Sequence, residues 1–455
     1  MNIKVDSRKV TKGDTFVALP GIKTDGHDYI EKAIENGATK IIAQHGKYLV
    51  DTLLVEDARK YLSDYLKETF SDDLKDIKFI GVTGTNGKTT ICYLIYNLLN
   101  ILGLKAAYIG TIGFYIDNQV ESLDNTTPEI TDLYDMFLKA KEKGVKVIVM
   151  EVSSHALEQG RVDGIEFDYA AFTNLTKEHL DFHINMENYS KAKQKLFERL
   201  KDEKVAVINA DDDYYKDFIK DQNNNLTLGF NKDSDYKILD YELHIDKTDF
   251  KFEYQNNTYS TTINLPGEYN IHNFLTALII VNKMGYSIEE ILSKTNILSA
   301  PPGRMDTVSY KGRSIIIDYA HTPDAVENVL NCVNSYKKAK VITLVGCGGD
   351  RDRAKRPVMG DIATRLSDYV IFSNDNPRTE DEKQIMDDIT RNLKANNYEI
   401  EYDREKAIKK GMSLLQEKDM FLILGKGHET YQIIGKEHIH FSDKEEVEKY
   451  IKEHN

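Results

Sequence analysis

The glycine-rich segment GVTGTNGKTT, at residues 81–90, constrains the fold of this chain more than any other feature. It follows the apolar run 79–82, which has the character of a buried strand, and it precedes apolar residues at helical spacing over 91–102. Its spacing differs from the usual G-x-x-x-x-G-K-[ST] loop, and an ordinary glycine-rich turn is the alternative. Strand, glycines, Lys-Thr-Thr and helix occur together, however. This combination favours a loop that binds nucleotide phosphates.

Four side chains in or near this region are candidates for phosphate and metal chemistry. Lys88 is expected to reach the β and γ phosphates, and Thr89 to offer its hydroxyl to Mg²⁺. Glu151 follows the apolar run 145–150 directly, the position at which many NTPases keep a metal-directed acid. His179 lies in NLTKEHLDFH, but an imidazole is an unusual ligand for Mg²⁺. A purely structural role is the alternative for Glu151 and His179.

Short apolar runs alternate with helix-length stretches along most of the chain, which predicts an α/β protein with mostly parallel sheets. A small α/β unit is expected first, with a helix at 29–36. The polar segment 62–78 is the first candidate linker, and SAPPG at 299–303 is the second boundary. A β-hairpin excursion is expected over 236–264, followed by a second Rossmann-like domain. The expected strands are 15–19, 40–43, 79–82, 145–150, 169–172, 205–208, 314–317, 341–345, 369–372 and 421–424.

Length and composition narrow the class of protein. A chain of 455 residues is long enough for about three domains. Its formal net charge of -14 makes it a poor general binder of nucleic acid or anionic membranes. Its three cysteines are far apart, which predicts neither disulfides nor structural zinc. The absence of a signal-type segment and of any apolar run near the ~18 residues of a membrane span predicts a cytoplasmic protein.

Four polar loops follow the expected strands of the last domain: DYAHTPD, GCGGDRDR, SNDNPRTED and GKGHETYQ. In open α/β sheets, ligands bind at the carboxyl ends of the strands. These loops are therefore expected to converge on one site. Arg378 could grip a carboxylate through two hydrogen bonds, and Glu429 could hold an ammonium. Arg161 is a candidate partner for a substrate carboxylate or phosphate, with a surface salt bridge as the alternative.

Ten motifs, in order along nearly the whole chain, resemble the Mur ligase family: GTNGKTT, EVSSHALEQGRVDG, NLTKEHLDFH, YSKAKQKLF, NADD, LPGEYNIHN, DYAHTPDA, GCGGDRDRAKRP, DNPRTED and GKGHETYQ. The resemblance implies a three-domain, ATP-dependent amide ligase of peptidoglycan biosynthesis. The DNPR signature implies the branch that adds meso-diaminopimelate to UDP-N-acetylmuramoyl-L-alanyl-D-glutamate through an acyl phosphate. The implied domains are 1–75 for the UDP-sugar, 76–300 for ATP and 301–455 for the amino acid. Small-molecule substrates and a monomer are expected.

The resemblance also implies roles for individual residues. The catalytic residues would be Lys88, Glu151, His179 and a carbamylated Lys193. The metal ligands would be Thr89, Glu151, His179 and Lys193. From the residues alone, Lys191 and Lys195 are equally plausible as the modified lysine. ATP would be bound by Gly84, Thr85, Asn86, Gly87, Lys88, Thr89, Thr90, Asn270, Asn273, Arg304 and Asp318. The UDP-substrate would be bound by Ser7, Asn125, Thr126, Thr127, Ser153, Gln159 and Arg161. The amino acid would be bound by Arg351, Asp375, Asn376, Pro377, Arg378, Gly425 and Glu429.

Three alternatives accompany this interpretation. The chain could be a second copy in the same family that takes lysine, another amino acid or a modified acceptor. It could be a ligase of the folylpolyglutamate synthetase type, although the DNPR loop and the DSR-type N-terminal region count against that. It could also be an inactive nucleotide-binding regulator, although the presence of Lys88, Glu151, His179 and Lys193 counts against it.

Overall fold

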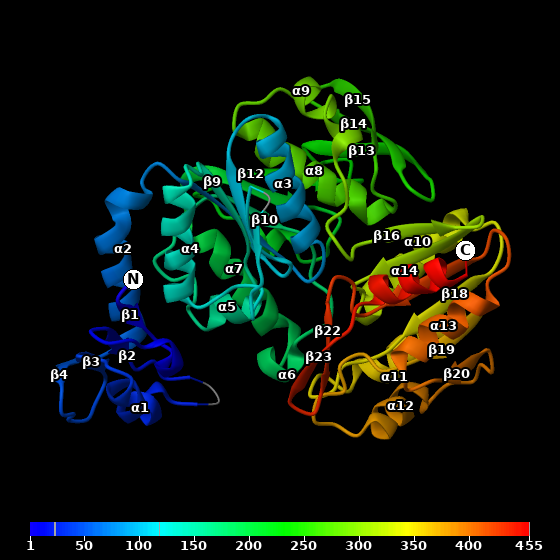
Figure 1. Ribbon diagram of the computed structural model, residues 1–455. Helices are drawn as coiled ribbons and strands as arrows, with labels where there is room; N and C mark the ends of the chain where they lie inside the picture. The colour runs from blue at the N-terminus through cyan, green and yellow to red at the C-terminus, as the bar shows by residue number, and fades with distance from the viewer. Residues whose placement is uncertain (22–23, 118, 455) are drawn as a thin grey trace. The chain divides into compact units, whose positions relative to one another are not determined.

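The computed structural model describes residues 1–21, 24–117 and 119–454 (Figure 1). Within these residues the strands form sheets of four, eleven, six and two strands. The chain divides into two compact units. The first unit contains residues 1–83, 103–170 and 192–204, and the second contains 84–102, 171–191 and 205–455.

The four-stranded sheet at the N-terminus belongs to the first unit. Its strands are all parallel, in the order β1-β2-β3-β4. Helix α1 (Ile30–Glu35) packs on it through Ile30 and Ala33, which share a core with Phe16 and Ile41. The expected strands 15–19 and 40–43 and the helix 29–36 are confirmed. The bounds of its strands and 3-10 turns are β1 Ile3–Lys4, η1 Ser7–Lys9, β2 Thr15–Val17, η2 Gly26–Tyr29, β3 Lys40–Ala43 and β4 Asp51–Leu54.

The expected linker at 62–78 is wrong over most of its length, because helix α2 occupies Ala58–Leu74. The Asp57 carboxylate caps this helix by accepting hydrogen bonds from the backbone N–H groups of Arg59 and Lys60 in the first turn. Leu62 and Leu66, one turn apart, are fully buried. The many charged residues lie on the other face of an amphipathic helix, so polarity alone was a misleading signal.

The eleven-stranded sheet has the order β15-β14-β13-β12-β11-β10-β5-β9-β6-β7-β8. In the first unit, β5 and β6 flank β9 in parallel, whereas β7 and β8 continue antiparallel. In the second unit, β11, β12 and β13 are parallel, and β13, β14 and β15 form an antiparallel meander. This meander occupies the excursion expected over 236–264. The strands are β5 Lys78–Thr83, β6 Ala106–Gly110, β7 Gly113–Ile116, β8 Gln119–Glu121, β9 Val147–Glu151, β10 Phe167–Phe172, β11 Leu200–Asn209, β12 Asn224–Gly229, β13 Tyr236–Leu243, β14 Thr248–Tyr254 and β15 Asn257–Ile263.

Helices and 3-10 turns alternate with the strands of this region. In the second unit, α3 and α8 pack together. In the first unit, α4 packs against α2. The bounds are α3 Lys88–Ile101, α4 Ile130–Glu142, α5 Ser154–Glu158, α6 Leu180–His183, α7 Met186–Glu198, η3 Tyr215–Phe218, α8 Glu268–Lys283, α9 Ile288–Leu292 and η4 Thr295–Ile297.

The six-stranded sheet lies in the second unit, with the order β16-β17-β21-β18-β19-β20. All its pairs are parallel except β16 with β17. Strands β16 and β20 and the two-stranded hairpin β22–β23 were not predicted. The elements are β16 Asp306–Tyr310, β17 Arg313–Asp318, α10 Pro323–Tyr336, β18 Val341–Val345, α11 Lys355–Leu366, β19 Tyr369–Phe372, α12 Glu382–Thr390, β20 Tyr398–Ile400, α13 Arg404–Leu414, β21 Met420–Leu424, β22 Tyr431–Ile434, β23 Glu437–His440 and α14 Asp443–Glu453.

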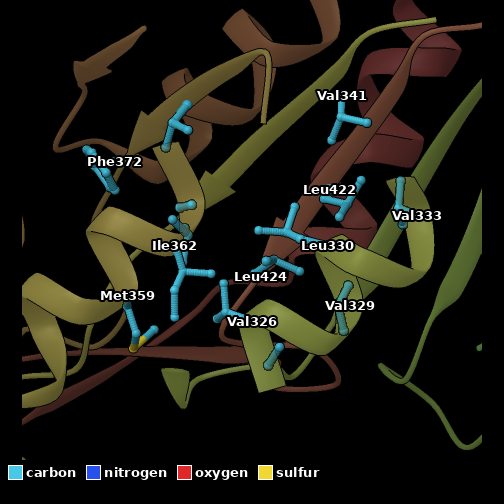
Figure 2. Packing of buried hydrophobic residues seen from close by; sticks show 14 of the residues in the cluster. Val326, Val329, Leu330, Val333, Val341, Met359, Ile362, Phe372, Leu422 and Leu424 are labelled. Carbon is cyan, nitrogen blue, oxygen red and sulfur yellow. The ribbon is translucent and has the colours of Figure 1, made fainter. Parts of the chain in front are cut away.

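Helices cover both faces of this sheet. Figure 2 shows one face, where α10 and α11 direct apolar side chains such as Leu330 and Ile362 onto Leu422 and Leu424 of β21. The other face packs on α13 and α14 through Ile408, Met412 and Val447. This two-sided burial explains why the strands read as continuous apolar runs. Among the described helices, none combines the length and apolar character that crossing a lipid bilayer requires.

Candidate functional site

The glycine-rich loop of the second unit has a conformation that its glycines make possible. Gly84 has φ +148, and a Cβ there would lie 1.8 Å from Thr173 Oγ1. Gly87 has φ +88 and stands immediately before α3, where a Cβ would lie 2.6 Å from Asn273 Oδ1. A larger residue at either position would clash and would strain the backbone. The loop therefore depends on both glycines.

Hydrogen bonds hold the loop around Lys88. Its Nζ donates to the carbonyls of Gly84 at 2.9 Å and Thr85 at 2.8 Å. Asn174 supports the loop from the strand-end side, since its carbonyl accepts from Thr85 N–H and its Oδ1 accepts from Asn86 N–H. Lys88 thus lies across the loop, and the N-terminus of α3, where the loop ends, favours anions.

Other predicted ATP-side residues of the second unit meet this loop. Asn273 Nδ2 donates to Asn270 Oδ1 at 2.9 Å, next to Gly87. Arg304 Nη2 donates to Thr89 Oγ1 at 3.2 Å, and its guanidinium lies 4.8 Å from the Tyr319 ring centroid. Arg304 Nε is buried and has no hydrogen-bond partner among the described residues. A cation with an unused donor beside a phosphate-type loop fits an anionic ligand.

Asp318, at the end of β17, holds the turn that follows Arg304. Its carboxylate accepts from the N–H groups of Met305 and Ala320, both at 2.8 Å. Burial raises the pKa of this carboxyl, and the charge of Arg304 and these hydrogen bonds oppose the rise. The structure thus assigns Asp318 contacts to the backbone around Arg304.

In the first unit, Glu151 is fully buried at the end of β9. Its Oε1 accepts from the Tyr108 hydroxyl at 2.5 Å and from Thr111 N–H at 2.9 Å, and its Oε2 accepts from Thr111 Oγ1 at 3.2 Å. These donors fix the orientation of the buried Glu151 side chain.

Several predicted UDP-substrate residues of the first unit lie around the backbone of Glu151. Thr127 Oγ1 donates to the Glu151 carbonyl at 2.9 Å and accepts from Ser153 N–H at 3.0 Å. Arg161 Nη1 donates to the Thr127 carbonyl at 3.0 Å, and Thr126 Oγ1 lies 3.0 Å from Thr111 Oγ1. Burial lowers the pKa of Arg161. An arginine held there retains donors for an anionic group.

The remaining predicted residues of this set are less closely connected. Gln159 is half-buried at the end of α5, and Asn125 is exposed. Ser7 is buried in the turn η1, and among the described residues no hydrogen bond joins it to Thr127 or Arg161.

Lys193 is 1 % exposed on α7. A buried ammonium requires compensation, which distinguishes it from the exposed Lys191 and half-buried Lys195.

His179 lies in the second unit, at a residue with φ +55 that precedes α6. Its neighbour Glu178 forms an ion pair with His321, with Oε1 3.5 Å from Nε2. Burial opposes ionisation of Glu178, but the hydrogen bond from His321 and the charge of His179 outweigh it and lower the pKa of this carboxyl far below its ordinary value.

A polar pocket in the second unit gathers all four strand-end loops of the six-stranded sheet, as the topology predicted. The predicted amino-acid residues Arg351, Asp375, Asn376, Arg378, Gly425 and Glu429 line it. Burial and the nearby Arg378 lower the pKa of Arg351. Two neighbouring guanidiniums favour a ligand with a carboxylate. The other lining residues are Lys177, Glu178, His179, Asp181, Tyr319, His321, Thr322, Cys347, Gly348, Asp352 and Lys355.

The unpredicted hairpin β22–β23 supports the DNPR loop. Arg378 has φ +53, and its N–H donates to the Ile433 carbonyl at 3.0 Å while its carbonyl accepts from Gly435 N–H at 2.8 Å. Arg378 Nη1 donates to the Gly349 carbonyl at 3.0 Å. Pro377 packs so closely on Gly349 that a Cβ there would lie 1.8 Å from the Pro377 carbonyl oxygen. The hairpin thus holds an arginine in a conformation that L-residues rarely adopt.

Two of the four predicted metal ligands have the chemistry that Mg²⁺ prefers. The Glu151 carboxylate and the Thr89 hydroxyl offer oxygen, which this ion prefers. His179 offers nitrogen, a less usual ligand. Lys193 could contribute only as a carbamate, because an ammonium has no lone pair.

A glycine-rich phosphate loop on one sheet and a polar pocket with two neighbouring arginines at the strand ends of another define an α/β protein of the phosphate-loop class. Three family models match the chain: the Mur ligase family, catalytic domain at residues 1–67, the Mur ligase middle domain at 82–281, and the Mur ligase, glutamate ligase domain at 303–427. The chain belongs to the Mur ligase family.

Relatives and a solved structure match over nearly the full length. The chain is 43% identical over 456 residues to the UDP-N-acetylmuramoyl-L-alanyl-D-glutamate–2,6-diaminopimelate ligase of Fusobacterium nucleatum, covering 97% of this chain and 92% of the relative. Identity to the ligase of the same name from Clostridium perfringens is 42%, covering 98% and 94%. A solved structure of a ligase with this name has a TM-score of 0.71 at 33% identity, covering 100% of this chain and 95% of its own.

Proposed function

We propose that this protein is an ATP-dependent ligase that joins 2,6-diaminopimelate to UDP-N-acetylmuramoyl-L-alanyl-D-glutamate in peptidoglycan biosynthesis. The carrying observation is the pocket in which Arg351, Arg378 and Glu429 come together. Its charges complement an amino acid that bears an extra carboxylate and an extra ammonium. Relatives of more than 40% identity carry the name of this activity, which supports the same conclusion.

The reaction needs little covalent chemistry from the protein. The γ-phosphoryl group of ATP passes to the carboxylate of the acceptor, giving an acyl phosphate and ADP. The amine of the incoming amino acid then attacks the acyl carbon, loses a proton and expels phosphate, leaving an amide. Positioning and charge compensation are therefore the main contributions of the chain. The loop from Gly84 to Thr90 and Arg304 would bind the ATP phosphates, and Asn270 and Asn273 would lie toward adenine.

Mg²⁺ is the metal that this reaction requires, and when bound it supplies positive charge that offsets the charge of the phosphates. We propose Thr89, Glu151, His179 and a carbamylated Lys193 as its ligands. Tyr108 and Thr111 would keep the Glu151 carboxylate oriented. Thr126, Thr127, Ser153 and Arg161 would bind the acceptor, together with Ser7, Asn125 and Gln159.

Specificity for diaminopimelate would come from the cost of leaving a charge unpaired. Arg378 would bind a carboxylate of the substrate, and Glu429 would bind an ammonium. Lysine lacks the second carboxylate, so Arg378 would stay without an anionic partner in a closed site. Asp375, Asn376, Pro377 and Gly425 would shape the pocket around these groups.

We propose that the reaction takes place in the cytoplasm and that the protein acts as a monomer. The domain functions follow in the order UDP-sugar, ATP and amino acid, with boundaries near residues 75 and 300.

The test is an amino-acid panel with purified protein, ATP, Mg²⁺ and the UDP-linked dipeptide, followed by phosphate release and product mass. Diaminopimelate should support ligation and lysine should not. Arg378→Ala should raise the KM for diaminopimelate far more than the KM for ATP. Arg365→Ala, an exposed arginine paired with Glu327, is the matched control and should behave as the wild type. Preference for lysine would refute the specificity.

A further inference from the structure

A fully buried lysine lies behind the amino-acid pocket. Lys426 is the second residue after β21 and has an exposed fraction of 0%. It does not line the pocket, although its neighbours Gly425 and Glu429 do. Burying an ammonium costs free energy unless its N–H groups find acceptors. This cost makes the partners of Lys426 informative.

Three acceptors surround the Lys426 ammonium. Its Nζ donates to Asn376 Oδ1 at 3.1 Å, to Glu429 Oε2 at 2.9 Å and to the Tyr431 carbonyl at 2.6 Å. An ammonium carries three N–H donors, so this set satisfies it completely. Two of the three partners are predicted amino-acid-binding residues.

The first consequence concerns the orientation of Asn376. Its side-chain oxygen accepts from Lys426 Nζ and from Ile433 N–H at 2.9 Å, and both are groups that can only donate. The other side-chain atom must therefore be the nitrogen, which donates to Glu429 Oε2 at 2.9 Å. The lysine and the β22 backbone together fix the carboxamide of Asn376.

The second consequence concerns Glu429. Both Lys426 and Asn376 donate to Oε2, so this oxygen is engaged on the protein side. Among the residues that the structure describes, none donates a hydrogen bond to Oε1, which is left for a ligand in the pocket. A carboxylate held by two donors through one oxygen presents the other in a defined direction.

The network also joins two loops that are far apart in the sequence. Asn376 follows β19, whereas Lys426 and Glu429 follow β21. The loops pack closely, since a Cβ at Gly425 would lie 2.5 Å from Asp375 Oδ2. Lys426 therefore acts where the two halves of the amino-acid pocket meet.

We propose that Lys426 is a positioning residue for recognition of the incoming amino acid, which it serves by aiming Glu429 Oε1 at the substrate ammonium and by locking Asn376. This inference rests on the proposed ligase function and adds a residue to it. Lys426 does not touch the substrate; it acts through Glu429 and Asn376.

The experiment compares Lys426→Met, Glu429→Gln and the double variant with the wild type in the ligation assay. Lys426→Met should raise the KM for diaminopimelate roughly ten- to hundredfold, the range spanned by loss of a charge-assisted hydrogen bond, and should leave the KM for ATP within about twofold. The double variant should be impaired clearly less than the product of the two single effects, because the lysine acts in part through that carboxylate. Lys436→Met, an exposed lysine at the hairpin tip, is the control and should be unchanged.

The outcomes separate the two levels of the proposal. Failure of the wild type to release phosphate with diaminopimelate would refute the ligase function itself. An active wild type with an unchanged KM for diaminopimelate in Lys426→Met, or with equal increases for ATP and diaminopimelate, would overturn the role of Lys426. The role of Lys426 would also be overturned if the effects of the two single substitutions on the KM for diaminopimelate multiplied in the double variant. If Lys426→Met does not fold, Lys426→Gln replaces it, with a smaller rise in the same KM expected.

Discussion

At the scale of single residues, the folded structure shifts the pKa of individual carboxylates through the hydrogen bonds that they accept. Asp211 is an example in the second unit. Its carboxylate accepts from His272 Nε2 at 2.7 Å and from the N–H groups of Phe230 and Asn231 at 2.8 and 3.1 Å. Burial opposes ionisation, but these hydrogen bonds outweigh it and lower the pKa of Asp211.

Replacing this carboxylate should change how stability depends on pH. Because the pKa is lower in the folded state, Asp211 contributes stability above its unfolded pKa of 3.8, and this contribution disappears as the pH falls through the folded pKa. Asp211→Asn should lower the free energy of unfolding by about 1–3 kcal/mol at pH 7. Denaturant unfolding at several pH values should show that the difference in free energy of unfolding between the wild type and Asp211→Asn becomes smaller below about pH 4. A difference that stays constant with pH would contradict the lowered pKa of Asp211.

At the scale of elements, buried ion pairs hold helices against the loops of the pocket. Arg404 at the start of α13 and Asp443 at the start of α14 are both fully buried, with Nε to Oδ1 at 2.7 Å and Nη2 to Oδ2 at 2.8 Å. Arg404 also donates to the carbonyls of Asn374 and Leu424, where two pocket loops begin. One side chain thus connects two helices to both loops.

Breaking this pair should be costly. Arg404→Met leaves the Asp443 carboxylate buried without its cation, so the free energy of unfolding should fall by about 3–5 kcal/mol. The double variant Arg404→Met/Asp443→Leu should recover part of that loss, because no charge is then left unpaired. Thermal and urea unfolding measure these changes. The control is Lys406→Met, which breaks an exposed ion pair with Asp403. A double variant less stable than Arg404→Met would show that the charges are not the cause.

At the scale of the whole molecule, the proposed metal belongs to the reaction and not to the fold. The apolar cores around Leu422 and Phe421 stabilise the six-stranded sheet from both faces. Removing divalent metal with a chelator should therefore abolish ligation while leaving the far-UV circular dichroism and the melting temperature without ligands unchanged. Added Mg²⁺ should restore activity. Loss of secondary structure on chelation would contradict this expectation.

The sequence predicted much of this architecture. The α/β class, the expected strands of the four-, eleven- and six-stranded sheets and membership of the Mur ligase family are confirmed. The helix α2 was mistaken for a linker because its charged face dominates its composition. Strand β20 and the hairpin β22–β23 were not predicted because they are short and none of their residues is buried. The domain boundaries and the roles assigned to single residues remain predictions.

What the sequence determined by itself is local. A strand, a glycine turn and a helix are set by residues close in the chain, so the phosphate loop and the apolar strands could be recognised from spacing alone. Only the tertiary structure decided that Lys426 meets Asn376, 50 residues away, and that a hairpin holds Arg378. Such contacts depend on which loops packing brings together, and no periodicity in a single chain encodes that.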